Sequence, residues 1–237
     1  MAQENLPLSE HLEELRWRLL RSSFLLLLTT FLSCFFVKSF LRFLIQPLGK
    51  TFYLSPSEAV LVHLKVALFL GFSLGFPYFL WEAWRFVSAG LLPDEKKFFF
   101  IYFPFALLAF FAGLLFAFFI VLPLCLRFFL SFGSDSLQPM ISIGSYVSFM
   151  SGLVFSFGLT FELPVVILFL SHLGLVTPSF LMDQWRYIVV AIFVIAAVVT
   201  PPDVLSQMLL ALPLLVLYGM SLFLSHLGSS WRKGRRV

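Results

Sequence analysis

The sequence predicts an all-α integral membrane protein with six transmembrane helices. Hydrophobic residues make up 60% of the 237 residues and charged residues only 12%, so a water-soluble fold would lack the polar side chains that cover a surface. The hydrophobic residues, 33 phenylalanines among them, are gathered in runs. Most of these runs approach the roughly 20 residues that a helix needs to cross a bilayer.

Six hydrophobic runs follow one another and predict a single transmembrane domain over residues 1–237. The predicted spans are 19–37, 66–92, 98–122, 147–170, 187–199 and 204–224. The fifth run covers only about 20 Å at 1.5 Å per residue, and the sixth contains Pro213, so both helices are expected to be short. Either the bilayer thins around the fifth run, or the fifth and sixth runs form a re-entrant hairpin.

The distribution of basic residues predicts that both termini are cytoplasmic. Five of the 16 lysines and arginines fall on the opposite side of the predicted spans: Lys38, Arg42, Lys50, Lys65 and Arg127. The other eleven lie on the side of the termini, and positive residues are retained in the cytoplasm. The longer loops, 38–65 and 123–146, are therefore predicted to be outside. Because the basic residues mark span ends, the net charge of +4 does not indicate nucleic-acid binding.

The sequence carries no motif of an enzyme, a metal site or a bound cofactor. Cys34 and Cys125 lie within or beside hydrophobic runs, without a second cysteine at metal or redox spacing. The histidines are scattered, and no Ser/His/Asp order, HExxH motif or glycine-rich phosphate loop occurs. We therefore expect a protein that is not an enzyme and holds neither metal nor cofactor.

Acidic residues precede the first span on a segment with one hydrophobic stripe. The stripe consists of Leu8, Leu12, Leu15 and Leu19. Its spacing is typical of a helix, which we expect to lie on the membrane surface before the chain turns inward. Glu14 can pair with Arg18, and Glu13 with Arg16. The carboxylates either form ordinary ion pairs on this helix or receive a cationic partner.

The turn between the second and third spans offers a second carboxylate on the cytoplasmic side. Pro93 favours a helix start, and Asp94 and Glu95 suit the first turn, where acids stabilise the helix dipole. Besides this structural role, Glu95 and Glu14 could meet the same polar peptide. Arginine is the natural ligand for two such carboxylates, because its guanidinium pairs with them bidentately.

Glu162 is the acid deepest inside a predicted span. An ionisable group there is costly, so we expect either a functional site or a partnered polar cluster. One hypothesis makes Glu162 the coupling acid of a small-solute or proton-coupled transporter. In the sixth run, Gln207 is expected to form an interhelical hydrogen bond, and Asp203 can cap the helix.

Six segments in order along the chain carry a family resemblance. They read His-Leu-Glu-Glu-Leu-Arg at 11–16, Ser-Pro-Ser-Glu-Ala at 55–59, Pro-Tyr at 77–78 with Trp-Arg-Phe at 84–86, Gly-Leu at 90–91 with Glu-Lys-Lys at 95–97, Phe-Gly at 157–158 with Phe-Glu-Leu-Pro-Val at 161–165, and Thr-Pro-Pro-Asp-Val at 200–204 with Ser-Gln at 206–207. The chain thereby resembles the TatC family, the receptor subunit of the twin-arginine protein translocase. Ala89 and Gly219 depart from the family pattern, and neither is a proposed binding carboxylate.

The resemblance implies a concave six-span bundle that recognises folded cargo by the paired arginines of its signal peptide. The signal-peptide-binding residues that it implies are Glu14, Glu95, Arg16 and Phe86. The intramembrane polar residues implied where partners dock are Glu162 and Gln207, and those with a structural or assembly role are Pro47 and Asp203. These roles come from the likeness and are expectations for the structure.

The resemblance also implies a cellular setting. It places the chain as a multi-pass protein in the cytoplasmic (inner) membrane of a prokaryote, with both termini cytoplasmic. The implied partners are the lipid bilayer, twin-arginine signal peptides, and single-span subunits of the TatA and TatB types, with self-association in a receptor complex. Export would draw on the proton-motive force.

Overall fold

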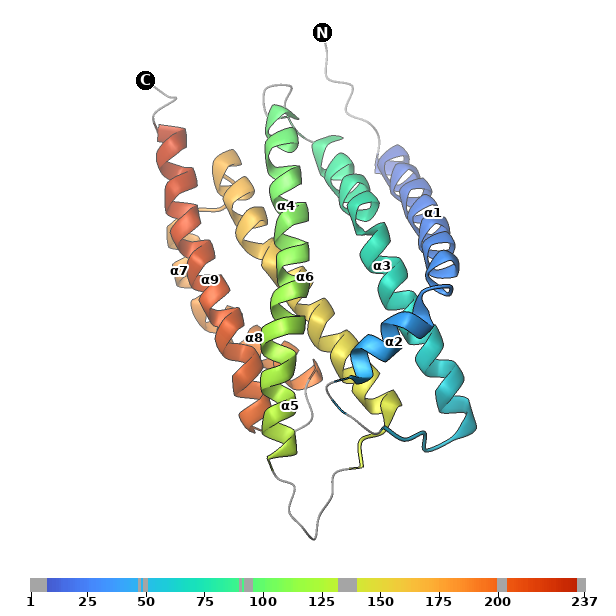
Figure 1. Cartoon of the computed structure of the whole chain (residues 1–237). Coiled ribbons are helices and arrows are strands. Elements are labelled where there is room, and N and C mark those ends of the chain that lie inside the picture. Colours follow the sequence, from blue (N-terminus) through green and yellow to red (C-terminus); the bar gives the residue numbers. More distant parts are fainter. Residues whose placement is uncertain are drawn as a thin grey trace. The chain divides into compact units, whose positions relative to one another are not determined.

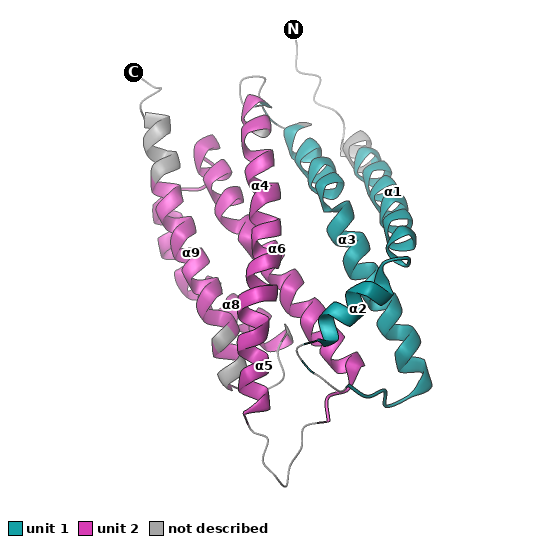
Figure 2. Cartoon of the chain, viewed as in Figure 1, with its two compact units in different colours: residues 1–96 teal, residues 97–237 magenta. Residues whose placement is uncertain are grey.

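The regular elements in the described part of the chain are helices, as the hydrophobic runs predict (Figure 1). The computed structural model describes residues 8–46, 48, 51–89, 91, 96–131, 140–199 and 204–233. Contacts between the helices divide the chain into two units, residues 1–96 (unit 1) and 97–237 (unit 2), coloured separately in Figure 2. Each unit is described by itself.

In unit 1, helix α1 (Leu8–Ser33) joins the acidic N-terminal segment to the first hydrophobic run without a break. No glycine or proline interrupts these residues. The expectation of a surface helix followed by an inward turn is therefore wrong, because nothing in the sequence ends the helix before the span. The bend comes after Ser33, where α2 (Val37–Ile45) departs at 71°.

Helix α3 (Pro56–Ala89) completes unit 1 and packs against both α1 and α2. It begins inside the predicted outer loop because Ser55 caps its N-terminus. The hydroxyl of Ser55 accepts a hydrogen bond from the Glu58 N–H, and the Glu58 carboxylate accepts one from the Leu54 N–H. Pro56 occupies the first helical position, where its missing N–H has no cost.

Gly71 allows α1 and α3 to approach closely. A Cβ atom at this position would lie 2.6 Å from the Cα of Thr30, which is backbone and cannot rotate away. We therefore expect Gly71→Ala to destabilise the protein by about 1–3 kcal/mol through overpacking. Gly219→Ala is the control, since nothing lies within 4 Å of its added Cβ. Unfolding of both variants in detergent measures the difference, and equal stability would contradict the packing.

Unit 2 begins with one long helical stretch made of α4 (Lys96–Phe116), η1 (Ala117–Val121) and α5 (Leu122–Leu130). The π-helical turn η1 stands directly before the turn that contains Pro123, which cannot donate to the helical ladder. The hydrogen-bonded helix thus continues past the third predicted span into the region expected to be an outer loop.

The second half of unit 2 is built around α6 (Ile143–Leu173), which packs against α8 (Trp185–Val199) and α9 (Val204–Lys233). Ser142 caps the start of α6, and Gly174 ends it with a left-handed φ of 76° that favours glycine. The short helix α7 (Pro178–Asp183) leads into α8. The hydroxyl of Tyr218 on α9 donates to the Leu181 carbonyl, which fastens α7 to α9.

Six hydrophobic helical stretches among the described residues correspond to the six predicted spans. Three stretches are long and hydrophobic enough to cross a membrane: Pro56–Ser88, Lys96–Leu130 and Ile143–Leu173. The bent pair of α1 and α2 adds a fourth, and the shorter hydrophobic stretches Trp185–Val198 and Leu210–His226 add two more. Helix α8 has 15 residues and spans about 22 Å, so the fifth helix is short as predicted. Helix α9 has 30 residues, so the sixth helix is longer than expected, because Pro213 lies inside it without ending it; its hydrophobic stretch covers only Leu210–His226.

Candidate functional site

Three charged side chains meet in unit 1, where α1 packs against α3. The Arg18 guanidinium on α1 donates through Nη1 to the Glu82 carboxylate on α3 at 2.6 Å. Its Nε donates to Oε1 of Glu14 at 3.1 Å, and its Nη2 donates to the same oxygen. We call these residues the Glu14–Arg18–Glu82 triad.

The triad is buried on one side and open on the other. The side chains of Glu82 and Arg18 are 7% and 11% exposed, whereas that of Glu14 is 33% exposed. A buried carboxylate is costly unless a cation compensates it, and Arg18 does so for Glu82. With two carboxylates and one guanidinium, the triad carries a net charge of −1. Because Arg18 is paired with the buried Glu82 and also donates to Glu14, it holds the Glu14 carboxylate in place at the exposed end of the triad.

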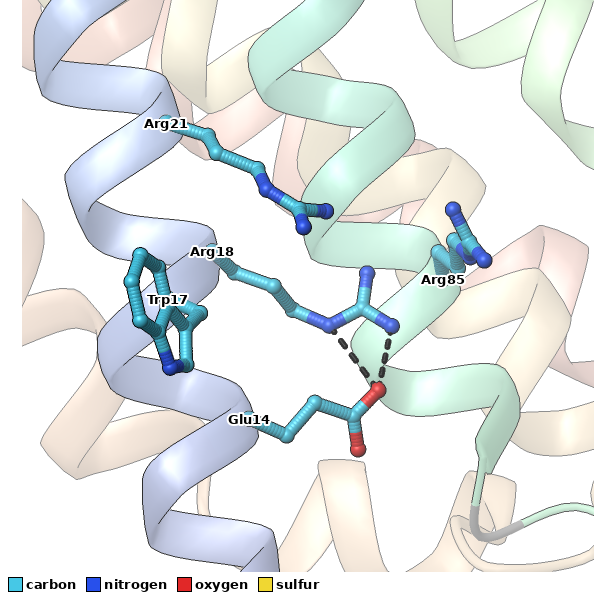
Figure 3. A pocket seen from close by; sticks show the side chains of 5 residues that line it. All are labelled: Glu14, Trp17, Arg18, Arg21 and Arg85. Atoms are coloured by element: carbon cyan, nitrogen blue, oxygen red, sulfur yellow. Dashed lines mark hydrogen bonds and ion pairs between the residues drawn. The ribbon is translucent and has the colours of Figure 1, made fainter.

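A cavity of about 400 Å³ lies beside the triad (Figure 3). It is lined by Glu14, Trp17, Arg18, Arg21 and Arg85. In Figure 3 the side chains of Arg18 and Arg21 extend from α1 toward α3, which carries Arg85. We call it the arginine cavity, because three of its lining residues are arginines and one is an acid.

The predicted signal-peptide residues have different positions in unit 1. Glu14 lies in the cavity wall, and its predicted pair with Arg18 is confirmed. Arg16 is exposed on α1, and among the described residues no ion pair joins it to Glu13. Phe86 is half-buried on α3, directly after Arg85. Three of the other predicted residues lie outside the described part of the chain: Glu95, Pro47 and Asp203.

Glu82 is the residue of this site that the sequence reasoning missed. It lies inside the predicted span 66–92, directly after the uncharged residues 66–81. An acid inside that span requires a partner for the same reason as Glu162 does. Applying that rule to every predicted span would have singled out Glu82.

The predicted polar residues of unit 2 lie on α6 and α9. Glu162 is 9% exposed, and within the described residues its two carboxylate oxygens have no hydrogen-bond partner. The side-chain amide of Gln207 on α9 donates to the Phe193 carbonyl on α8 at 3.0 Å. The expected interhelical hydrogen bond of Gln207 is thus confirmed, and it joins the two helices of the last hairpin.

Known proteins resemble this chain over most of its length. Residues 10–213 match the family described as Sec-independent protein translocase protein (TatC). The protein of that name from Carboxydothermus hydrogenoformans is 40% identical over 230 residues, which cover 95% of each chain. Its namesake from Aquifex aeolicus is 39% identical over 236 residues, 96% of this chain and 98% of that one.

Solved structures agree with these sequence matches. A crystal structure of the twin-arginine translocase receptor TatC has a TM-score of 0.86 at 37% identity, and the match covers 92% of this chain and 99% of that chain. A second, in DDM, has a TM-score of 0.85 at 38% identity. The predicted fold class, an all-α polytopic membrane protein with six transmembrane helices, is confirmed.

Proposed function

Because the chain belongs to the TatC family of Sec-independent protein translocase proteins, we propose that it is the subunit that binds the paired arginines of signal peptides. As a family member it is a membrane component of the twin-arginine translocase, a transport protein and not an enzyme. In our proposal Glu14 takes a signal arginine at the cytoplasmic face. Partner subunits then act with the chain to export the folded cargo.

The observation that carries this proposal is the position of the Glu14 carboxylate, which is partly exposed and held by Arg18. It is one-third exposed at a cavity wall, and Arg18 holds it while being held in turn by the buried Glu82. Glu14 is the more exposed of the two carboxylates that share the Arg18 guanidinium. A guanidinium pairs with a carboxylate through two parallel hydrogen bonds, whereas an ammonium group offers only a point charge. A site of this kind prefers arginine to lysine.

The charges of the cavity indicate that Glu14 alone would not bind both arginines of a signal peptide. The three arginines of the arginine cavity outnumber its one carboxylate, so a pair of incoming cations needs a second acid. Glu95 is that acid in our proposal, by its match to the family pattern. Arg16 and Phe86 would lie beside the bound peptide on the same helices as Glu14 and Glu82.

Site-specific crosslinking tests the proposal. A photoreactive residue at Trp17, which lines the cavity, is expected to crosslink to a peptide with paired arginines and not to its paired-lysine counterpart. The matched control is a probe at Phe43, which is exposed on α2 and outside the cavity. Equal crosslinking of the two peptides at Trp17 would contradict arginine recognition, and equal crosslinking at Trp17 and Phe43 would contradict the location.

The family also supports a proposal for the later steps of transport. We place the chain in the cytoplasmic membrane of a prokaryote with both termini inside, in self-associating complexes with TatA-type and TatB-type subunits. The proton-motive force supplies the energy. The buried Glu162 carboxylate, unpaired among the described residues, offers two hydrogen-bond acceptors to a polar group on a docking partner.

Glu162→Gln separates this role from recognition. We expect the change to leave peptide binding unaltered and to lower export at least about tenfold, because it removes an intramembrane acid while keeping its shape. Export assays and peptide binding measured on the same preparations check this. The transporter hypothesis instead requires proton flux through the chain alone in liposomes, lost in Glu162→Gln. Such flux would favour a solute transporter over a translocase subunit.

A further inference from the structure

The arginine cavity has the chemistry of an anion site, and we propose that it binds the phosphate of an anionic phospholipid whose acyl chains lie along α1. This inference does not rest on the proposed recognition of signal peptides. It rests on the charge of the cavity and on a hydrophobic surface of α1 that begins at the cavity wall.

Two cations of the cavity are available to an anion. Arg18 is engaged by Glu14 and Glu82, but within the described residues neither Arg21 nor Arg85 forms an ion pair. Both line the same cavity, one from α1 and one from α3 (Figure 3). Arginine pairs with phosphate bidentately, and an unpaired arginine beside other arginines gains from a bound anion.

An exposed hydrophobic surface of α1 starts where the cavity does. It consists of Trp17, Leu20, Phe24, Leu27 and Phe31, which we call the α1 stripe. The spacings of three and four residues place these side chains on one face of the helix, and each is at least 50% exposed. Trp17 lines the cavity and also heads the stripe, and tryptophan is enriched at membrane interfaces.

Because the α1 stripe begins at the wall of the arginine cavity, the anion that fits both is a lipid headgroup. A soluble phosphate would use only the arginines, whereas a phospholipid places its phosphate at Arg21 and Arg85 and its acyl chains on the α1 stripe. An anionic lipid such as phosphatidylglycerol brings a net negative charge to the cavity. A zwitterionic lipid such as phosphatidylcholine brings a cation as well, which the three arginines disfavour.

Native mass spectrometry of the detergent-solubilised full chain tests the proposal. We expect phosphatidylglycerol to bind about tenfold more tightly than phosphatidylcholine, and Arg21→Gln with Arg85→Gln to remove this preference. The matched control is Lys38→Gln with Arg42→Gln, which removes two exposed cations of α2 outside the cavity and should keep the preference. Should the double variant fail to fold, Arg21→Gln and Arg85→Gln alone are each expected to lower the preference about threefold.

Three results would overturn the inference. The wild-type chain could bind both lipids equally, or the Arg21/Arg85 variant could retain its preference. Glycerol phosphate could also displace phosphatidylglycerol at equal concentration, which would indicate a soluble anion instead of a lipid. Glu14→Gln separates this inference from the proposed function, because losing the acid that lines the cavity should strengthen lipid binding while it weakens peptide binding.

Discussion

Glu14→Gln is expected to weaken binding of a paired-arginine peptide about 30-fold, because it removes one partner of a hydrogen-bonded charge pair that the bound peptide would cover. Glutamine keeps the size of the side chain and loses the charge that a guanidinium needs. Titration of the purified chain with the peptide measures the effect. Stability should change by only about 1 kcal/mol, because Glu14 is partly exposed and Arg18 keeps Glu82 as its partner.

Glu13→Gln is the control for this change. Glu13 is exposed, stands next to Glu14 and forms no ion pair within the described residues. Its replacement removes the same charge from the same helix and should change peptide binding less than about twofold. Equal losses in the two variants would mean that peptide binding depends on the general negative charge of the segment, and the assignment to Glu14 would fail.

Glu82→Gln is expected to cost about 3 kcal/mol of stability, because it leaves a buried arginine without its buried partner. Glu14 still pairs with Arg18 in this variant, which limits the loss of stability. It does not prevent the loss, because Glu14 is the more exposed acid. Reversible unfolding in detergent measures the change. Peptide affinity should fall as well. Without Glu82, Arg18 loses its hydrogen bond to α3 and positions the Glu14 carboxylate less firmly.

A second variant separates charge burial from packing. Arg18→Met combined with Glu82→Met replaces the buried pair by hydrophobic side chains, which is often neutral or stabilising. We therefore expect this double variant to be more stable than Glu82→Gln alone. If Glu82→Gln is no less stable than Glu13→Gln, the Arg18–Glu82 pair contributes nothing to the packing of α1 on α3.

Local patterns in the sequence predicted the parts of the site that are close along the chain. The pair of Glu14 and Arg18 follows from their spacing of four residues on a helix. The pair of Arg18 and Glu82 joins residues 64 positions apart. It depends on how α1 and α3 are aligned, which the close approach of Gly71 to Thr30 helps to set. A single sequence does not contain that alignment in any local pattern.

Hydrophobicity locates a membrane span, whereas hydrogen bonding sets where its helix begins and ends. Hydrophobic runs located the spans, but the helices extend beyond them wherever capping and backbone hydrogen bonds continue. The Ser55 cap starts α3 ten residues before residue 66, the predicted start of the span. In α1 the acidic and hydrophobic segments differ in composition and still form one helix, because composition changes do not end a helix.

A double-mutant cycle between Glu14 and the signal arginines tests arginine recognition most directly. Binding is measured for the wild-type chain and Glu14→Gln, each with the paired-arginine and the paired-lysine peptide. Coupling of about 1–3 kcal/mol is expected, because the preference for arginine should fall when one of the two proposed carboxylates is lost. Additive changes, with the same preference for arginine in both chains, would show that Glu14 does not contact the paired arginines.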